Sequence, residues 1–100
     1  MIVDLIIPVL NEEASIGLVI RDLPKGIIRH TIVCDNGSID KTVEVALSSG
    51  AIVLHEPKKG YGAACLKGME YLLHQDIESD IVLFIDGDYS DFPQQATLLL

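Results

Sequence analysis

Cysteine is scarce in this sequence. The two cysteines, Cys34 and Cys65, are too few and too far apart for a disulfide framework or a zinc site. A reducing compartment fits this usage, and we expect the protein to be cytoplasmic. Long apolar runs are also missing, because the opening stretch 1–10 is too short to span a bilayer and contains Asp4 and Pro8. That stretch also lacks the basic segment that begins a signal peptide.

Positively charged residues are also scarce. Lysine and arginine total 7 against 15 aspartates and glutamates, which gives a net charge of −8. This balance argues against nucleic acid as a partner, because no basic stripe is present to meet a phosphate backbone. An anionic ligand would therefore need local help from a metal ion, a helix N-terminus or the few lysines.

Apolar residues, in contrast, are abundant: they make up 49% of the 100 residues, enough for the core of one domain. Apolar runs at 1–7, 27–34, 51–55 and 80–85 predict strands. Helices are predicted from an Asn11 cap to Leu23, at 41–49, at 63–74, and from Pro93 onward. The order β-α-β-α-β-α-β-α predicts an α/β fold, with a Rossmann-like, mostly parallel sheet covered by helices on both faces.

Polar and turn-forming residues gather where the predicted strands end. They are Pro8 to Glu12, Asp35 and Asn36, Lys58 to Gly62, and Asp86 to Ser90. The carboxyl ends of parallel strands share one edge of the sheet, and ligands of such sheets bind just outside that edge. The sequence therefore predicts a single site assembled from all four segments.

The pair Asp86 and Asp88 is the most informative of these segments. In extended backbone, residues two apart leave the strand on the same face. Two close carboxylates repel each other unless they share a proton or a cation. Mg²⁺ or Mn²⁺ would bind one or two such carboxylates and keep its other positions for water and substrate phosphates. The same residues, with Gly87 between them, also fit an ordinary turn.

The other segments likewise have a structural interpretation beside the functional one. Asn11 and Glu12 fit the start of a helix, and Asp35 fits a turn. The glycines at 60 and 62 fit tight packing, or else a helix start whose N–H groups approach a diphosphate. Lys58 and Lys59 fit solvated loop charges as well as ligand contacts. The sequence alone leaves these alternatives open.

Taken together, four stretches resemble the N-terminal, nucleotide-binding half of family-2 glycosyltransferases of the GT-A fold. They are 6–13 (IIPVLNEE), 33–42 (VCDNGSIDKT), 60–68 (GYGAACLKG) and 86–93 (DGDYSDFP). The last two are most similar to the branch of dolichyl-phosphate mannose synthase, which transfers a sugar from a nucleotide sugar to a polyprenyl phosphate. The resemblance implies a nucleotide-diphosphate sugar donor and Mg²⁺ or Mn²⁺.

The resemblance also implies roles for individual residues. Pro8 and Glu12 would line the nucleoside pocket, and Asp35 would contact the base. Asp86 and Asp88 would be the Asp-x-Asp motif, with Asp86 near the ribose or sugar and both carboxylates assigned to the metal. The full nucleotide-binding set would be Pro8, Asn11, Glu12, Asp35, Lys59, Gly60, Gly62 and Asp86.

Departures from the family pattern qualify these roles. Leu10 stands where the family often has an aromatic residue, and Asn36 stands where an aspartate is common. Family members continue beyond this length to the acidic catalytic base, so we expect residues 1–100 to be the donor-binding part of a truncated glycosyltransferase. The acceptor would be a polyprenyl phosphate at a membrane surface or another acceptor. The alternative is a non-catalytic nucleotide-binding or interaction fragment, whose apolar 98–100 end favours a homo-oligomer.

Three other classes fit less well. Haloacid-dehalogenase phosphatases carry Asp-x-Asp on their first strand, whereas only 14 residues follow Asp86 here. A dinucleotide-binding glycine motif would need glycine at Cys65. An EF-hand loop beginning at Asp86 would need glycine at Asp91 and glutamate at Thr97.

Overall fold

The computed structural model describes residues 1–88 and 97–99. Its elements are β1 (Val3–Val9), α1 (Ile16–Arg21), β2 (Ile28–Asp35), α2 (Thr42–Ser48), β3 (Ile52–His55), α3 (Tyr61–Leu73), β4 (Ile81–Phe84) and β5 (Thr97–Leu99). The strands form one sheet in the order β3-β2-β1-β4-β5. All neighbours in it are parallel except β4 and β5. The predicted α/β fold class, with a mostly parallel sheet, is confirmed.

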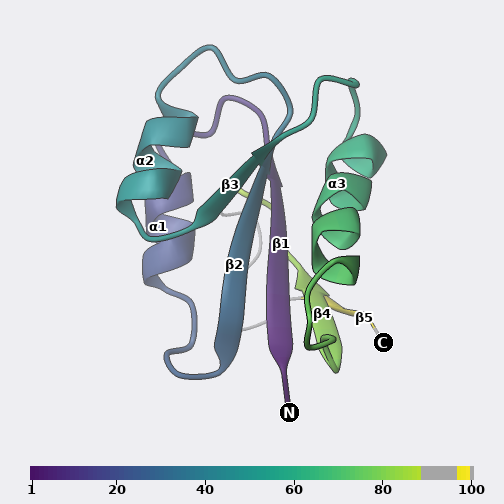
Figure 1. The fold of residues 1–100 in the computed structure, drawn as a ribbon. Coiled ribbons are helices and arrows are strands. Elements are labelled where there is room, and N and C mark those ends of the chain that lie inside the picture. Colours follow the sequence, from purple (N-terminus) through teal and green to yellow (C-terminus); the bar gives the residue numbers. More distant parts are fainter. Residues whose placement is uncertain (89–96, 100) are drawn as a thin grey trace.

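Helices cover both faces of this sheet (Figure 1), with α1 and α2 on one side and α3 on the other. The central strand β1 is buried at all 7 positions, because its alternating side chains meet both helical layers. Leu5 and Ile7 join the core under α1 and α2, whereas Ile6 joins the core under α3. The opening strand of the chain is therefore the centre of the fold.

The first helix begins later than the sequence predicts. It starts at Ile16 with Ser15 at the N-cap position, and no acidic residue lies in its first turn. Asn11 instead has a φ of 54°, and its Oδ1 accepts a 2.9 Å hydrogen bond from the N–H of Ile39. The prediction that Asn11 caps this helix, with Glu12 in its first turn, is wrong, because the loop after β2 uses the Asn11 side chain.

The predicted fourth helix is wrong where the structure describes it, since Thr97–Leu99 form strand β5. Their partners on β4 are residues 82–84. This pairing satisfies backbone groups along the edge of β4, which the local residue pattern cannot reveal. Pro93 and the side chains of 98–100, on which the expected self-association depends, lie outside what the structure describes. Within residues 1–88 and 97–99, every helix is too short or too polar to cross a membrane.

Helix α3 approaches β1 closely through the buried Gly68. A Cβ atom at Gly68 would lie 2.9 Å from both Cδ1 and Cγ2 of Ile6. A Cβ atom at Gly62, on the same helix, would meet nothing within 4 Å. Both glycines have ordinary helical backbone, so the difference between them is one of space alone.

We expect Gly68→Ala to lower the free energy of unfolding by about 1–3 kcal/mol, because the added methyl group overpacks the fully buried Ile6. Gly62→Ala is the matched control, and we expect it to raise that free energy by up to about 1 kcal/mol through helix propensity. Urea unfolding followed by circular dichroism measures both. A Gly68→Ala variant as stable as the parent would contradict the close approach of α3 to β1.

The amino ends of the strands hold a buried ion pair that the sequence analysis did not identify. Asp4 on β1 is fully buried, and its carboxylate accepts hydrogen bonds from Arg29 Nε at 3.0 Å and Nη2 at 2.6 Å. The His30 N–H donates to it at 3.0 Å, and the Ser79 hydroxyl also donates. Burial acts to raise the pKa of Asp4, but the hydrogen bonds from Arg29 and Ser79 outweigh it and hold the pKa below its usual value. This cluster ties together β1, β2 and the segment before β4.

Candidate functional site

A cleft of about 540 Å³ lies at the carboxyl ends of the strands. Strand β1 lies between β2 and β4. The crossover from β1 to β2 uses α1 on one face of the sheet, and the crossover from β3 to β4 uses α3 on the other, so the sheet changes its winding direction at β1. Ligands of open α/β sheets bind at such a switch point. The lining residues are Pro8, Val9, Leu10, Glu12, Asn36, Lys59, Gly60, Tyr61, Ala64, Asp86, Gly87 and Asp88.

The cleft brings together six of the residues that the sequence singles out: Pro8, Glu12, Lys59, Gly60, Asp86 and Asp88. Asn11 and Gly62 are exposed, and Asp35 is buried; none of these three is among the lining residues. Tyr61 lines the cleft although the sequence analysis gave it no role. The signal that could have identified it is its position between two glycines at the start of α3.

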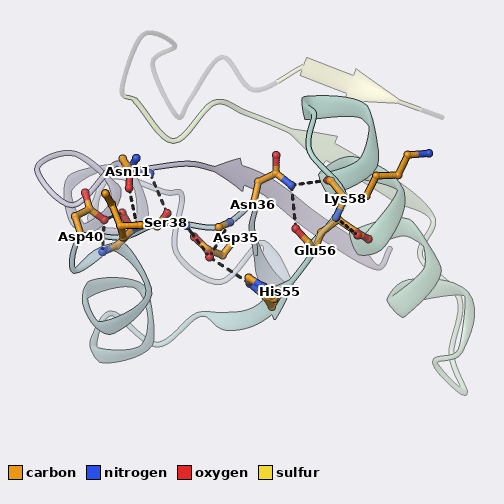
Figure 2. A network of polar contacts seen from close by, with 11 residues as sticks. Asn11, Asp35, Asn36, Ser38, Asp40, His55, Glu56 and Lys58 are labelled. Atoms are coloured by element: carbon orange, nitrogen blue, oxygen red, sulfur yellow. Dashed lines mark hydrogen bonds and ion pairs between the residues drawn. The ribbon is translucent and has the colours of Figure 1, made fainter.

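Asp35 is only 2% exposed, and its carboxylate holds the turn that follows β2. It accepts hydrogen bonds from the N–H groups of Gly37 and Ser38, both at 3.2 Å. His55 Nδ1 lies 3.4 Å from the same carboxylate. Figure 2 shows the His55 side chain directed at Asp35. The N–H groups of the turn therefore already bind the Asp35 carboxylate. The contact of Asp35 with a nucleobase stays a prediction.

The Asp86-Gly87-Asp88 segment is fixed to the sheet through its central glycine. A Cβ atom at Gly87 would lie 2.6 Å from Cγ1 of Val9, so any other residue there would displace the Val9 side chain. The Gly87 carbonyl accepts a 2.6 Å hydrogen bond from the Ser15 hydroxyl, at the start of α1. Asp86 is half-buried and Asp88 is exposed, and both border the cleft. Packing of the backbone at Gly87 thus holds the two carboxylates at one wall.

Two loops beside the cleft are bonded to each other. The N–H of Glu12 donates a 2.7 Å hydrogen bond to Oγ1 of the fully buried Thr42. The N–H of Asn11 donates to the Ser38 hydroxyl at 2.9 Å, in the part of the network that Figure 2 shows. These hydrogen bonds fix the backbone at Asn11 and Glu12, and so place Glu12 at the cleft.

The start of α3 contributes differently from what the glycine pattern predicts. Gly60 has a φ of 125° and is the N-cap residue of the helix, which begins at Tyr61, two residues before the predicted start. Its N–H donates a 2.9 Å hydrogen bond to Asn36 Oδ1. The Gly60 N–H is therefore already hydrogen-bonded within the protein. At the N-terminus of α3, residues that follow Gly60 border the cleft.

The wall of the cleft is more acidic than basic. Among the described lining residues, Glu12, Asp86 and Asp88 are acidic and Lys59 is the one cation. Desolvation, together with the nearby Cys65 and Asp86, raises the pKa of Tyr61 to about 12, so this hydroxyl stays protonated at neutral pH. Such a wall would hold a diphosphate poorly by itself, because carboxylates repel phosphates.

The donor set at the Asp86-Gly87-Asp88 segment fits a hard divalent cation. Carboxylate oxygens are the ligands that Mg²⁺ and Mn²⁺ prefer. No cluster of three or more histidine, cysteine, aspartate or glutamate side chains in the described residues could hold a metal. A cation at the Asp86-Gly87-Asp88 segment would be held by one or two carboxylates and would complete its coordination with ligand phosphates and water.

Comparisons with known proteins point to one family. The family model described as "Glycosyl transferase family 2" matches residues 4–100. Protein RfbJ of Shigella flexneri is 39% identical over 84 residues, which cover 83% of this chain and 61% of that protein. Dolichyl-phosphate hexose transferase of Haloferax volcanii is 42% identical over 57 residues, which cover 54% of this chain and 24% of that protein.

A solved structure is also similar to this chain in fold and sequence. Glucosyl-3-phosphoglycerate synthase from Mycobacterium tuberculosis, in complex with Mn²⁺, UDP and glucosyl-3-phosphoglycerate, matches with a TM-score of 0.73 and 32% identity. The match covers 86% of this chain and 33% of that chain. The present chain thus spans less than two thirds of each of these three relatives.

Proposed function

This chain belongs to glycosyltransferase family 2, and on that basis we propose that residues 1–100 are the nucleotide-sugar-binding part of a hexosyltransferase that uses Mg²⁺ or Mn²⁺. The observation that carries the proposal is the single cleft that joins Asp86 and Asp88 with Pro8, Glu12 and Lys59. Support comes from glucosyl-3-phosphoglycerate synthase, whose structure of similar fold contains Mn²⁺ and UDP.

In this proposal each wall of the cleft has its own task. Pro8 and Glu12 border the nucleoside, and Asp35 contacts the base. Asp86 lies near the ribose or sugar, and Asp86 and Asp88 hold the cation. When bound, Mg²⁺ or Mn²⁺ acts as a Lewis acid that stabilises the negative charge on the departing nucleoside diphosphate. We place the catalytic base beyond residue 100.

We favour a polyprenyl phosphate at a membrane surface as the acceptor. The support is the resemblance of 60–68 and 86–93 to polyprenyl-phosphate glycosyltransferases, together with the similarity to dolichyl-phosphate hexose transferase. A phosphoglycerate-type acceptor is the second candidate, because the similarity to glucosyl-3-phosphoglycerate synthase covers 86% of the chain. A non-catalytic nucleotide-binding role is the alternative for the 100 residues alone, since they span at most 61% of the three relatives compared.

The proposal predicts a stabilisation that needs nucleotide and metal together. Thermal unfolding is measured with UDP and with GDP, each with and without MnCl₂. At a nucleotide concentration of 100 times Kd we expect a gain of about 2.7 kcal/mol in the free energy of unfolding. The base that gives the larger gain identifies the donor nucleotide. Absence of any gain, or an equal gain without Mn²⁺, would contradict the proposal.

A further inference from the structure

We infer that Asn36 is a positioning residue for the diphosphate end of the cleft, because its amide fixes the loop that presents Lys59. The inference rests on the proposed function. Asn36 follows β2 and is only 7% exposed. Its own N–H continues the sheet by donating a 3.0 Å hydrogen bond to the carbonyl of Val9. The residue is therefore anchored to the central strands.

The Asn36 side chain uses both halves of its amide on a single loop. Its Nδ2 donates to the carbonyl of Glu56 at 3.0 Å and to the carbonyl of Lys58 at 2.8 Å. Its Oδ1 accepts from the N–H of Gly60 at 2.9 Å. Figure 2 shows Asn36 facing Glu56 and Lys58. Three hydrogen bonds thus attach the loop between β3 and α3 to the end of β2.

Only an amide satisfies this arrangement. An aspartate has nearly the same shape, but an ionised carboxylate is an acceptor only and cannot donate to two carbonyls. It would direct an oxygen at the carbonyls of Glu56 and Lys58, and leave both without their partner. Asn36 is only 7% exposed, so water would weakly screen the repulsion between its new carboxylate and the two carbonyl oxygens, and the loop would have to move.

The loop is bonded on both sides of Lys59, at Lys58 and at Gly60. Lys59 Nζ lies 3.9 Å from the position that a Cβ atom on Gly37 would take, and Lys59 lines the same cleft as Asn36. Because Lys59 is the one cation among the described lining residues, its placement sets the positive charge available to a phosphate. A preorganised cation binds a phosphate more tightly than one that must first be ordered.

The test compares Asn36→Asp with Gln75→Glu, which makes the same chemical change far from the cleft. Gln75 also donates its amide to a backbone carbonyl, that of Tyr71, at 3.3 Å. Calorimetry gives the Kd of UDP in excess MnCl₂, and NMR gives the hydrogen-exchange rate of the Gly60 N–H. We expect Asn36→Asp to raise the Kd about five- to tenfold and to speed exchange at Gly60, while Gln75→Glu matches the parent.

A double-mutant cycle separates positioning from a general loss of structure. Lys59→Gln should raise the Kd by a similar factor, and the double variant with the uncharged Asn36→Ser should raise it no further, because Asn36 acts through Lys59 and serine adds no carboxylate that repels the diphosphate itself. The inference would be overturned if the Kd increases of the two single variants multiplied in the double variant. Parent-like UDP binding by Asn36→Asp would also overturn it. If Asn36→Asp does not fold, Asn36→Ser also replaces it in the calorimetric and hydrogen-exchange comparison. Absence of UDP binding by the parent chain would instead overturn the proposed function, and the inference with it.

Discussion

Replacing Asp88 by asparagine is expected to remove the Mn²⁺-dependent part of the stabilisation by UDP. The amide keeps the shape of the side chain but lacks the charge that a hard divalent cation requires. At a UDP concentration of 100 times the parent Kd, we expect a loss of about 2.7 kcal/mol, which is the whole ligand effect. Stability without ligand is measured for each variant, so that any structural effect of the substitution is subtracted from the ligand effect.

Asp76→Asn is the matched control for this experiment. Asp76 is also exposed, lies between α3 and β4, and is not among the residues that line the cleft. The substitution removes the same charge, so a general electrostatic effect would appear in both variants. Thermal unfolding with and without MnCl₂ at fixed UDP measures the difference. Full Mn²⁺-dependent stabilisation of Asp88→Asn would show that the metal assignment is wrong.

Replacing Asp4 by alanine is expected to lower the free energy of unfolding by about 2–3 kcal/mol, because the half-buried Arg29 loses its ion-pair partner and the His30 N–H and Ser79 hydroxyl lose their acceptor. Urea unfolding measures this change. Asp22→Ala is the control, since Asp22 pairs with the exposed Arg21 at 2.9 Å on the surface. A surface pair contributes about 1 kcal/mol or less. Similar effects of the two substitutions would contradict the role of the buried pair.

The pH dependence of stability provides a second test of Asp4. Its pKa in the folded protein lies below the unfolded value of about 3.9, so the folded state binds fewer protons at that carboxyl. The stabilisation is therefore present above about pH 4 and is lost as the pH falls through the folded pKa. Hydrogen bonds from Thr42 also lower the pKa of Asp40, but that group is common to parent and variant. The stability difference between parent and Asp4→Ala should shrink below pH 4 in urea unfolding.

The sequence by itself determined the central architecture. Continuous apolar runs can be buried only between two layers, so the existence of strands β1 to β4 and their parallel direction follow from the local pattern. The same reasoning placed Asp86 and Asp88 at the sheet edge near Pro8 and Glu12, because parallel strands all end on one side. Gly87, interpreted from the sequence as a turn glycine, also lies where a Cβ atom would press on Val9.

The tertiary structure alone decided how the polar side chains are used. Asn11 bonds to Ile39, and Asn36 bonds to Glu56, Lys58 and Gly60, all more than 15 residues away along the chain. On α2, Leu47 is 56% exposed, whereas Val45 packs on the core. Strand β5 likewise replaced a predicted helix, because the edge of β4 needed backbone partners. A buried polar group must find a partner wherever the fold brings one, and sequence spacing carries no record of that choice.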